Sequence, residues 1–228
     1  MSPVAVLIPA FNAERSIAAV VAGTLRHVST VVVVDDGSVD RTAEEARAAG
    51  ATVIQHAVNR GKGAALQTGM RWLTENHFCR ALTLDADGQH LPEEIPRLLE
   101  AAEADRDAIW IGDRQLERLT EVTTPIKRFG NRFANRWVEI ACGMSIPDTQ
   151  SGFRIYPIAT TLALGVRAQR FAFETEVLIR ARRAGITVHS VPVKVYYPRP
   201  EERISHFRPF ADTVRIIFVV VGLILRLW

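Results

Sequence analysis

Two aspartates separated by one residue follow a short apolar segment in the first half of the chain. Asp85 and Asp87 come directly after residues 80–84, which we expect to form a buried strand. Carboxylates at this spacing on an extended chain project to the same side. They suit a hard divalent cation such as Mg²⁺ or Mn²⁺, with Gln89 as a further oxygen ligand and a diphosphate supplying others. The segment therefore predicts a metal site that stabilises a departing diphosphate, although so short a motif also occurs in surface turns.

Two further polar segments could bind a nucleotide. One follows an apolar run, and the other precedes a helical segment. Asp36 follows the apolar residues 30–34, and its carboxylate would accept hydrogen bonds from a base or a ribose. The alternative is a turn in which aspartate and serine cap the next helix. Residues 59–63 (NRGKG) precede a helical segment, so backbone N–H groups and Lys62 would suit a phosphate. This segment is not a P-loop, because Gly63 stands where serine or threonine should follow the lysine.

These polar segments need a frame that brings them together. Apolar runs predict strands at residues 4–8, 30–34, 51–55, 80–84 and 108–111, with helices between them at residues 13–25, 41–49, 64–74 and 92–104. Asn12 and Asp40 precede two of these helices and are the expected N-caps. The alternation predicts an α/β fold with a mostly parallel, Rossmann-like central sheet and helices on both faces. Such sheets bind ligands outside the carboxyl ends of their strands, which is where the acidic segments lie.

The second half of the chain is predicted to be less regular. We expect helices at residues 125–143 and 174–184 and strands at residues 151–156 and 187–197. The first of these helices carries a row of arginines beside a row of aromatic residues: Arg128, Arg132 and Arg136 beside Phe129, Phe133 and Trp137. Such a helix suits a lipid headgroup boundary and an anionic lipid phosphate. An ordinary amphipathic surface helix shows the same pattern, so both interpretations stay open.

Composition and charge exclude several classes of protein. The chain has 228 residues, of which 48% are hydrophobic, so it is not a disordered protein. A net charge of +3 does not indicate a dedicated nucleic-acid binder, but it suits an enzyme that meets phosphates or an anionic membrane surface. We expect one main domain at residues 1–208 and a C-terminal apolar helix at residues 209–228. The apolar run at residues 216–225 is too short to span a bilayer, which takes about 20 helical residues, so it should lie on a membrane or form an interface.

Five segments occur in the order found in family 2 glycosyltransferases: residues 9–12 (PAFN), 33–38 (VVDDGS), 59–63 (NRGKG), 85–90 (DADGQH) and 150–154 (QSGFR). The chain resembles most closely the branch with dolichyl-phosphate mannosyltransferases and bacterial polyprenyl-phosphate glycosyltransferases. The resemblance implies the A-type glycosyltransferase fold and an inverting transfer of one sugar from a nucleotide-diphosphate sugar to a lipid-linked phosphate. The apolar run at residues 216–225, too short to span a bilayer yet too apolar for water, further predicts a cytoplasmic enzyme that is peripheral on the inner face of the membrane. The QxxRW signature of processive relatives is absent from the sequence, which favours transfer of a single sugar.

The resemblance assigns roles to individual positions. Pro9, Phe11 and Asn12 would line the nucleotide pocket, and Asp36 would hold the nucleoside. Asp85 would face the donor, while Asp87 and Gln89 would hold Mg²⁺ or Mn²⁺. The expected acceptor-binding residues come from the arginine-bearing helix, the QSGFR segment and the loop after the last strand: Arg128, Arg132, Ser151, Arg199, Arg203 and Ser205.

Several alternatives remain open at this point. A hydroxyl of a lipid or glycolipid as acceptor would require a general base, for which Asp148 and Glu174 are the candidates. A non-catalytic nucleotide-sugar or membrane-binding module is the competing class of function. The sequence does not choose between donors of the GDP-mannose and UDP-glucose types, and it does not fix the oligomeric state.

Overall fold

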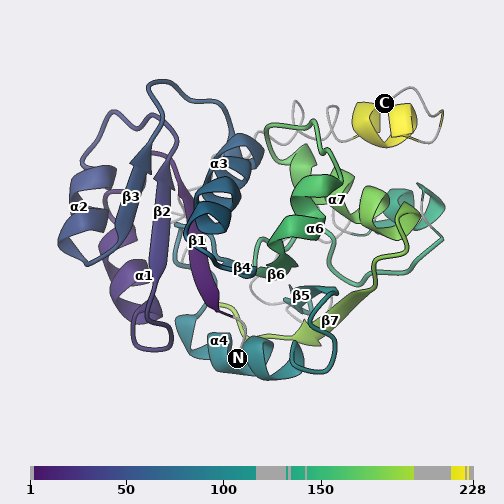
Figure 1. The fold of residues 1–228 in the computed structure, drawn as a ribbon, viewed down its shortest axis with the longest axis horizontal. Helices are drawn as coiled ribbons and strands as arrows, with labels where there is room; N and C mark the ends of the chain where they lie inside the picture. The colour runs from purple at the N-terminus through teal and green to yellow at the C-terminus, as the bar shows by residue number, and fades with distance from the viewer. Residues whose placement is uncertain are drawn as a thin grey trace.

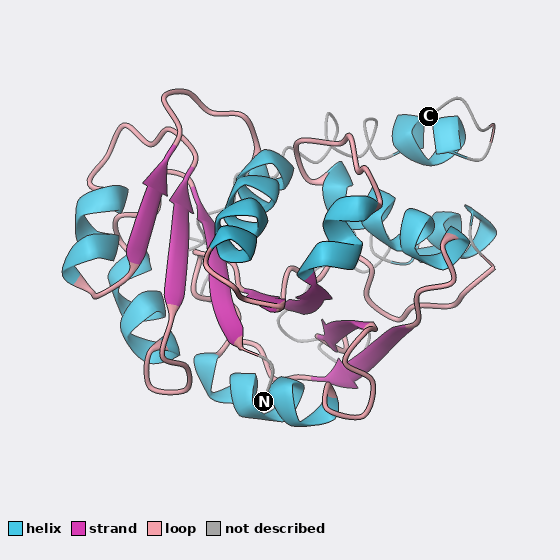
Figure 2. Ribbon diagram, viewed as in Figure 1, coloured by secondary structure: helices cyan, strands magenta, loops and turns pink. Residues whose placement is uncertain are grey.

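The computed structural model describes residues 3–116, 132, 135–141, 143–197, 217–223 and 225. The predicted α/β architecture is confirmed: one seven-stranded sheet has the order β3-β2-β1-β4-β6-β5-β7, with helices on both of its faces (Figures 1 and 2). The elements are β1 (Val4–Ala10), α1 (Ile17–Thr24), β2 (Val31–Asp35), α2 (Thr42–Ala48), β3 (Thr52–Gln55), α3 (Lys62–Glu75), β4 (Arg80–Thr83), η1 (Pro92–Glu94), α4 (Ile95–Ala101), β5 (Ile109–Asp113), β6 (Arg154–Pro157), α6 (Ile158–Ala163), α7 (Ala172–Arg183) and β7 (Val188–Pro192).

One strand runs against all the others. β6 pairs antiparallel with both β4 and β5, whereas the remaining pairs in the sheet are parallel. Because β6 is reversed, its first residues lie at the same edge as the carboxyl ends of β4 and β5. The turn before Arg154 therefore sits beside the segment that follows β4, and the sheet brings two of the polar segments together.

The core lies in two layers, one on each face of the sheet. Residues of β1 alternate between them, with Ala5 and Leu7 facing α3 and α7, and Val6 and Ile8 facing α1 and α4. Continuous burial of β2 on both faces explains why its sequence is an unbroken apolar run. The sheet is thus a rigid platform whose carboxyl edge carries the polar loops.

Some local expectations were wrong. α1 begins at Ile17 after Ser16, so Asn12 is not its N-cap. Asn12 instead has a φ of 47° and accepts a hydrogen bond from the Val39 N–H at 3.0 Å, which ties the loops after β1 and β2 together. The short helix α6 was not predicted, and its β-branched residues give little helical preference to a segment of six residues.

The C-terminal apolar run contributes to the core. Residues 217–223 are helical, and Val219, Val220 and Leu223 are buried in the same core layer as α3 and α7. Phe218 and Leu225 are 70% and 60% exposed. In the part of the chain that is described, no helix is long and apolar enough to cross a membrane. The run therefore has one face on the protein and leaves large apolar side chains on the other.

Candidate active site

Lys62 joins two carboxylates at the centre of the carboxyl edge. Its Nζ lies 2.6 Å from Asp85 Oδ1 and 2.9 Å from Glu174 Oε1. Burial disfavours the charged ammonium, but the charges of Asp85 and Glu174 outweigh it and raise the pKa of Lys62. Burial likewise opposes ionisation of Asp85, yet Lys62 and neighbouring cations lower the pKa of this carboxyl to about 2. The three groups therefore form two linked ion pairs that fix the orientation of Asp85.

Gly152 covers this cluster from the turn before β6. A Cβ atom at position 152 would lie 2.5 and 2.6 Å from the carboxylate oxygens of Asp85 and 2.7 Å from Lys62 Nζ. The Gly152 carbonyl accepts a hydrogen bond from Thr83 Oγ1 at 2.7 Å, which fixes the turn against the end of β4. A larger residue at this position of the QSGFR segment would therefore displace the Asp85 carboxylate and the Lys62 ammonium from their contact.

Arg154 builds the turn that carries Gly152. Its fully buried guanidinium donates to the carbonyls of Ser151, Thr149 and Glu174 at 2.7, 2.8 and 2.9 Å. Ser151, predicted to bind the acceptor, is itself buried, and its Oγ accepts a hydrogen bond from the Phe153 N–H at 3.4 Å. The QSGFR segment is thus a rigid element of the site whose buried residues hold its shape.

Asp87 differs from Asp85 in having no basic partner among the described residues at ion-pair distance. Its Oδ1 accepts a hydrogen bond from the Gln89 N–H at 2.9 Å. Burial and the nearby charge of Asp85 raise the pKa of Asp87 to about 6. Crowded carboxylates of this kind are stabilised by a cation. Within the described ranges no three acidic, histidine or cysteine side chains are placed to enclose a metal ion on their own, so oxygens from a ligand would have to complete its shell.

Asp36 anchors the glycine-rich segment. Its carboxylate accepts hydrogen bonds from the N–H groups of Arg60 and Gly61 at 2.9 and 2.6 Å, and it lies 2.7 Å from His56 Nδ1. Asn12 is tied to the loop after β2, because its N–H donates a hydrogen bond to Ser38 Oγ at 2.9 Å. Pro9 and Phe11 lie half-buried at the end of β1 and just beyond it. The residues expected to bind the nucleotide therefore surround the carboxyl ends of β1 and β2.

The NRGKG segment makes close contacts with the rest of the protein. Gly61 has a φ of 97° and, with Gly63, allows α3 to pack directly on residues 168–173. The Ala64 N–H donates to the Gln169 carbonyl at 2.9 Å, so the first turn of α3 is partly covered by protein. The glycines therefore support close packing, and Lys62 is directed to two carboxylates.

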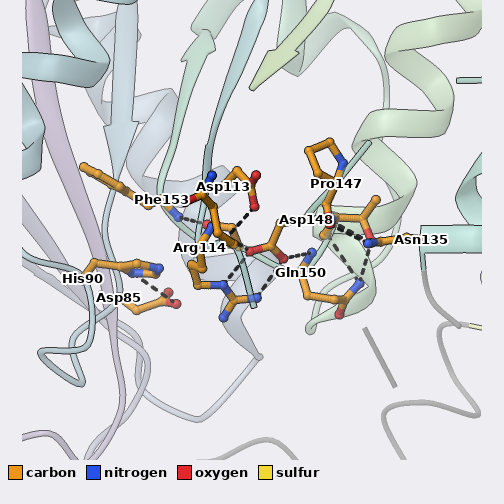
Figure 3. Close-up of polar contacts among 12 residues, drawn as sticks. Asp85, His90, Asp113, Arg114, Asn135, Pro147, Asp148, Gln150 and Phe153 are labelled. Carbon is orange, nitrogen blue, oxygen red and sulfur yellow. Dashed lines mark hydrogen bonds and ion pairs between the residues drawn. The ribbon is translucent and has the colours of Figure 1, made fainter. Parts of the chain in front are cut away.

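Asp148 forms a buried ion pair that the sequence did not reveal. Arg114 donates to both of its oxygens, from Nε at 2.7 Å and from Nη2 at 2.9 Å (Figure 3). Asp148 is 1% exposed, and although burial opposes its ionisation, Arg114 holds the pKa of the carboxyl below its usual value. Figure 3 shows Arg114 between Asp148 on one side and the pair of Asp85 and His90 on the other.

His90 was quoted within the DADGQH segment but received no role. Its ring is 3% exposed, stacks on Phe153 at a centroid distance of 5.5 Å, and has Nδ1 3.8 Å from Asp85 Oδ2. Burial lowers the pKa of His90 to about 4, so the imidazole is neutral at pH 7. The backbone beside it pairs with the segment after β7, through a hydrogen bond from the Tyr196 N–H to the Gln89 carbonyl at 2.9 Å. The DADGQH segment thus contacts the chain that follows β7.

Most of the expected acceptor residues lie outside the described part of the chain. These are Arg128, Arg199, Arg203 and Ser205. Arg132 is exposed and helical, and residues 135–141 are also helical, in agreement with the expected helix. Asn135 of this helix accepts hydrogen bonds from the N–H and Oγ1 of Thr149 at 3.0 and 2.7 Å. The helix is therefore held against the segment that carries Asp148.

Comparison with known proteins adds independent information. A family model described as Glycosyl transferase family 2 matches residues 5–158. The chain is 31% identical over 199 residues to an undecaprenyl-phosphate mannosyltransferase of Micrococcus luteus, covering 82% of this chain and 81% of that protein. It is 29% identical over 212 residues to a UDP-N-acetylglucosamine–dolichyl-phosphate N-acetylglucosaminyltransferase of Methanococcus voltae, covering 84% of each chain.

A solved structure shares the fold. Glucosyl-3-phosphoglycerate synthase from Mycobacterium tuberculosis, in complex with Mn²⁺, UDP-glucose and phosphoglyceric acid, superposes with a TM-score of 0.72 at 19% sequence identity. The alignment covers 98% of this chain and 80% of that one. The A-type fold expected from the sequence is therefore confirmed.

Proposed function

Because this chain belongs to glycosyl transferase family 2, we propose that it transfers one sugar from a nucleotide-diphosphate sugar to the phosphate of a polyprenyl-phosphate lipid. The transfer inverts the anomeric carbon and uses Mg²⁺ or Mn²⁺. The enzyme works at the cytoplasmic surface of a membrane, where the lipid acceptor resides. The two curated relatives described above support the acceptor class, since both are named for transfer to a lipid phosphate. Their names differ in the sugar, which leaves the donor open.

The main support for a phosphate acceptor is that both candidate general bases, Asp148 and Glu174, are held in ion pairs. Both oxygens of Asp148 accept hydrogen bonds from Arg114, and Glu174 is paired with Lys62. Neither carboxylate is in a position to take a proton from an alcohol without breaking a buried ion pair. A phosphate monoester is already nucleophilic near neutral pH and needs positioning more than a base. The geometry therefore favours a phosphate acceptor over a hydroxyl.

The residues after β4 fit a divalent cation. Asp87 and the side-chain amide of Gln89 would hold it, with donor diphosphate oxygens completing the shell. The absence of a basic partner for Asp87 in the described residues and its raised pKa of about 6 support this assignment. The cation supplies Lewis-acid stabilisation of the departing diphosphate. Asp85, held by Lys62, is left to face the donor sugar in a fixed orientation.

The proposed step needs no proton transfer. An oxygen of the lipid phosphate forms a bond to the anomeric carbon from the face opposite the leaving group. The bond between that carbon and the donor diphosphate oxygen breaks, and its electron pair stays on the nucleoside diphosphate. Attack from the opposite face inverts the anomeric carbon. The protein contributes orientation of both substrates and electrostatic stabilisation, which are large terms in such reactions.

The acceptor is proposed to lie between the helix at residues 125–143 and the loop after β7. Arg128, Arg132, Arg199 and Arg203 would bind its phosphate there, because a planar guanidinium matches phosphate oxygens well. Exposed Phe218 and Leu225 offer an apolar surface close to the lipid chain. The contact between Gln89 and Tyr196 would link this loop to the metal site.

A direct assay tests the proposal. The purified full chain is incubated with decaprenyl phosphate and GDP-mannose, UDP-glucose or UDP-N-acetylglucosamine, with Mn²⁺, with Mg²⁺ or with EDTA. We expect a lipid-phosphate sugar from at least one donor, formed with either cation and lost with EDTA. Turnover that is unchanged by EDTA would contradict the metal assignment, and no product with any donor would contradict the acceptor class.

A further inference from the structure

A second basic site lies apart from the catalytic cluster. A groove of ≈ 360 Å³ runs between α3 and the loop that joins α6 to α7. It is lined by three arginines, two glutamines and two small or apolar residues: Arg60, Arg71, Arg167, Gln67, Gln169, Ala64 and Val166. Among the described residues, no carboxylate belongs to this lining. The groove therefore presents three positive charges and two amides to whatever enters it.

The three arginines are not neutralised by their neighbours. Within the described ranges none of them forms an ion pair, and the hydrogen bond of Arg71 to Gln67 Oε1 at 3.3 Å leaves its charge in place. All three residues are exposed. Like charges that converge on one groove repel, and an anion bound between them removes that repulsion. Charge complementarity thus indicates an anionic occupant.

The walls of the groove are held in place by buried carboxylates. Asp36 accepts the Arg60 N–H at 2.9 Å, and fully buried Glu176 accepts the Arg167 N–H at 3.2 Å. The two walls are joined where Ala64 N–H donates to the Gln169 carbonyl. The backbone positions that carry the arginines are therefore fixed before any ligand arrives, which limits the ordering cost of binding.

The groove faces away from the catalytic cluster. Residues 64, 67 and 71 recur at helical spacing along one side of α3, and Arg60 lies just before its first turn. Lys62 lies on another side of the same turn and is directed to Asp85 and Glu174. A ligand in the groove would thus be separated from the donor site by α3 itself.

The surroundings of the groove favour a lipid headgroup as the anion. Figure 1 shows the start of α3 and the loop between α6 and α7 at the same end of the molecule as helix 217–223. Val58, two residues before Arg60, is 66% exposed, and helix 217–223 carries the exposed side chain of Phe218. Apolar tips beside arginines are typical of a surface that meets lipid headgroups. The volume suits one headgroup and not a polymer such as RNA.

We propose that this groove binds the phosphate of an anionic phospholipid and so orients the enzyme on the membrane. The inference rests on the proposed function only for the expectation that the enzyme meets a membrane. It adds a lipid site, distinct from the acceptor site, in which Arg60, Arg71 and Arg167 contact one headgroup. A guanidinium fork matches phosphate oxygens in such a contact.

Vesicle binding tests this inference without donor or acceptor. Co-sedimentation of the full chain is measured with phosphatidylglycerol–phosphatidylcholine vesicles and with phosphatidylcholine vesicles. The groove variant combines Arg60→Gln, Arg71→Gln and Arg167→Gln. A matched control removes the same charge from exposed arginines elsewhere: Arg26→Gln, Arg97→Gln and Arg182→Gln. We expect the groove variant to bind anionic vesicles roughly a hundredfold more weakly at low salt, about fivefold per arginine, and the control to change much less.

Three results would overturn the proposal. The first is an equal loss of binding in the groove variant and the control, which would indicate a diffuse charge effect. The second is an unchanged affinity of the groove variant for anionic vesicles. The third is binding of inorganic phosphate to the groove without binding of vesicles. Because all these residues are exposed, thermal unfolding should match the wild type and confirm that each variant is folded. Failure of the transferase assay would leave the vesicle result intact, so the two proposals fail independently.

Discussion

Arg114 and Asp148 form a two-point ion pair, with Nε and Nη2 of the arginine at 2.7 and 2.9 Å from the two carboxylate oxygens. The pair joins the end of β5 to the segment that precedes β6, across 34 residues of sequence. Such a pair positions the Asp148 carboxylate, and Glu174 is held in the same way by Lys62. The proposed mechanism therefore uses neither carboxylate as a general base.

The first prediction concerns the stability that Asp148 provides. Asp148→Asn should lower the free energy of unfolding by about 3–5 kcal/mol at pH 7, because it leaves Arg114 charged and buried without its partner. The pKa of Asp148 in the folded protein is depressed, so its stabilisation is present above the unfolded pKa of about 4 and is lost as the pH falls. Urea unfolding should show a gap between wild type and variant that shrinks below about pH 4. A gap that does not depend on pH would contradict the ion-pair account.

The second prediction separates Lys62 from Glu174. Lys62→Met should lower kcat by roughly tenfold to over a hundredfold, because Asp85 loses a charge-assisted contact worth ~1.5–3 kcal/mol. Adding Glu174→Gln to this variant should restore stability, since it removes one of two unpaired carboxylates, without restoring turnover. Glu174→Gln alone should keep most of the activity. If Glu174→Gln alone abolished turnover with an unchanged donor affinity, Glu174 would be a base after all.

The third prediction tests the close approach of Gly152. Gly152→Ala should abolish turnover, because the added Cβ would lie within 2.7 Å of Lys62 Nζ and closer still to Asp85. Gly185→Ala is the control, since no atom lies within 4 Å of its Cβ position although its φ is +77°. The control should lose some stability through backbone strain and keep its activity. Near-normal kcat in Gly152→Ala would show that the cluster is not as tightly covered as the geometry indicates.

The fourth prediction concerns the metal. Asp87→Asn should leave the fold intact and reduce Mn²⁺ binding in the presence of a nucleoside diphosphate to background by isothermal titration calorimetry, because the ion loses its main charged ligand. Asp107→Asn, an exposed aspartate elsewhere, is the control and should bind Mn²⁺ as the wild type does. Retained Mn²⁺ affinity in Asp87→Asn would mean that the cation site has been assigned to the wrong residue.

Much of the frame was predictable from local sequence. Apolar runs marked the first five strands within a few residues, because strands buried on both faces contain few polar residues. Their carboxyl ends then placed Asp36, Asp85 and Asp87 at one edge of the sheet. The reversal of β6 was not predictable in this way, since strand direction depends on the path of the long segment between β5 and β6.

The partners of the charged residues were also hidden in the sequence. Lys62 was expected to meet a phosphate, but its nearest groups are Asp85 and Glu174, which come from other elements. Asp148 was a candidate base because it lies just before the QSGFR segment, and its partner, Arg114, comes from 34 residues away. Ion pairs of this kind are tertiary contacts, and no local pattern marks them. The glycines of the NRGKG segment predicted a phosphate-binding turn because they lack side chains. The same property lets α3 pack closely on residues 168–173.

The central claim is that a lipid phosphate attacks the donor without a general base. The most direct test is to measure which acceptor, a phosphate or an alcohol, receives the sugar. Decaprenyl phosphate and decaprenol are compared as acceptors for the wild type and for Asp148→Asn, with the active donor and Mn²⁺. The account predicts product with the phosphate only, and a variant that is less stable but still transfers to it below its unfolding temperature. Transfer to decaprenol by the wild type that is lost in Asp148→Asn would contradict the account and would restore general-base catalysis on an alcohol.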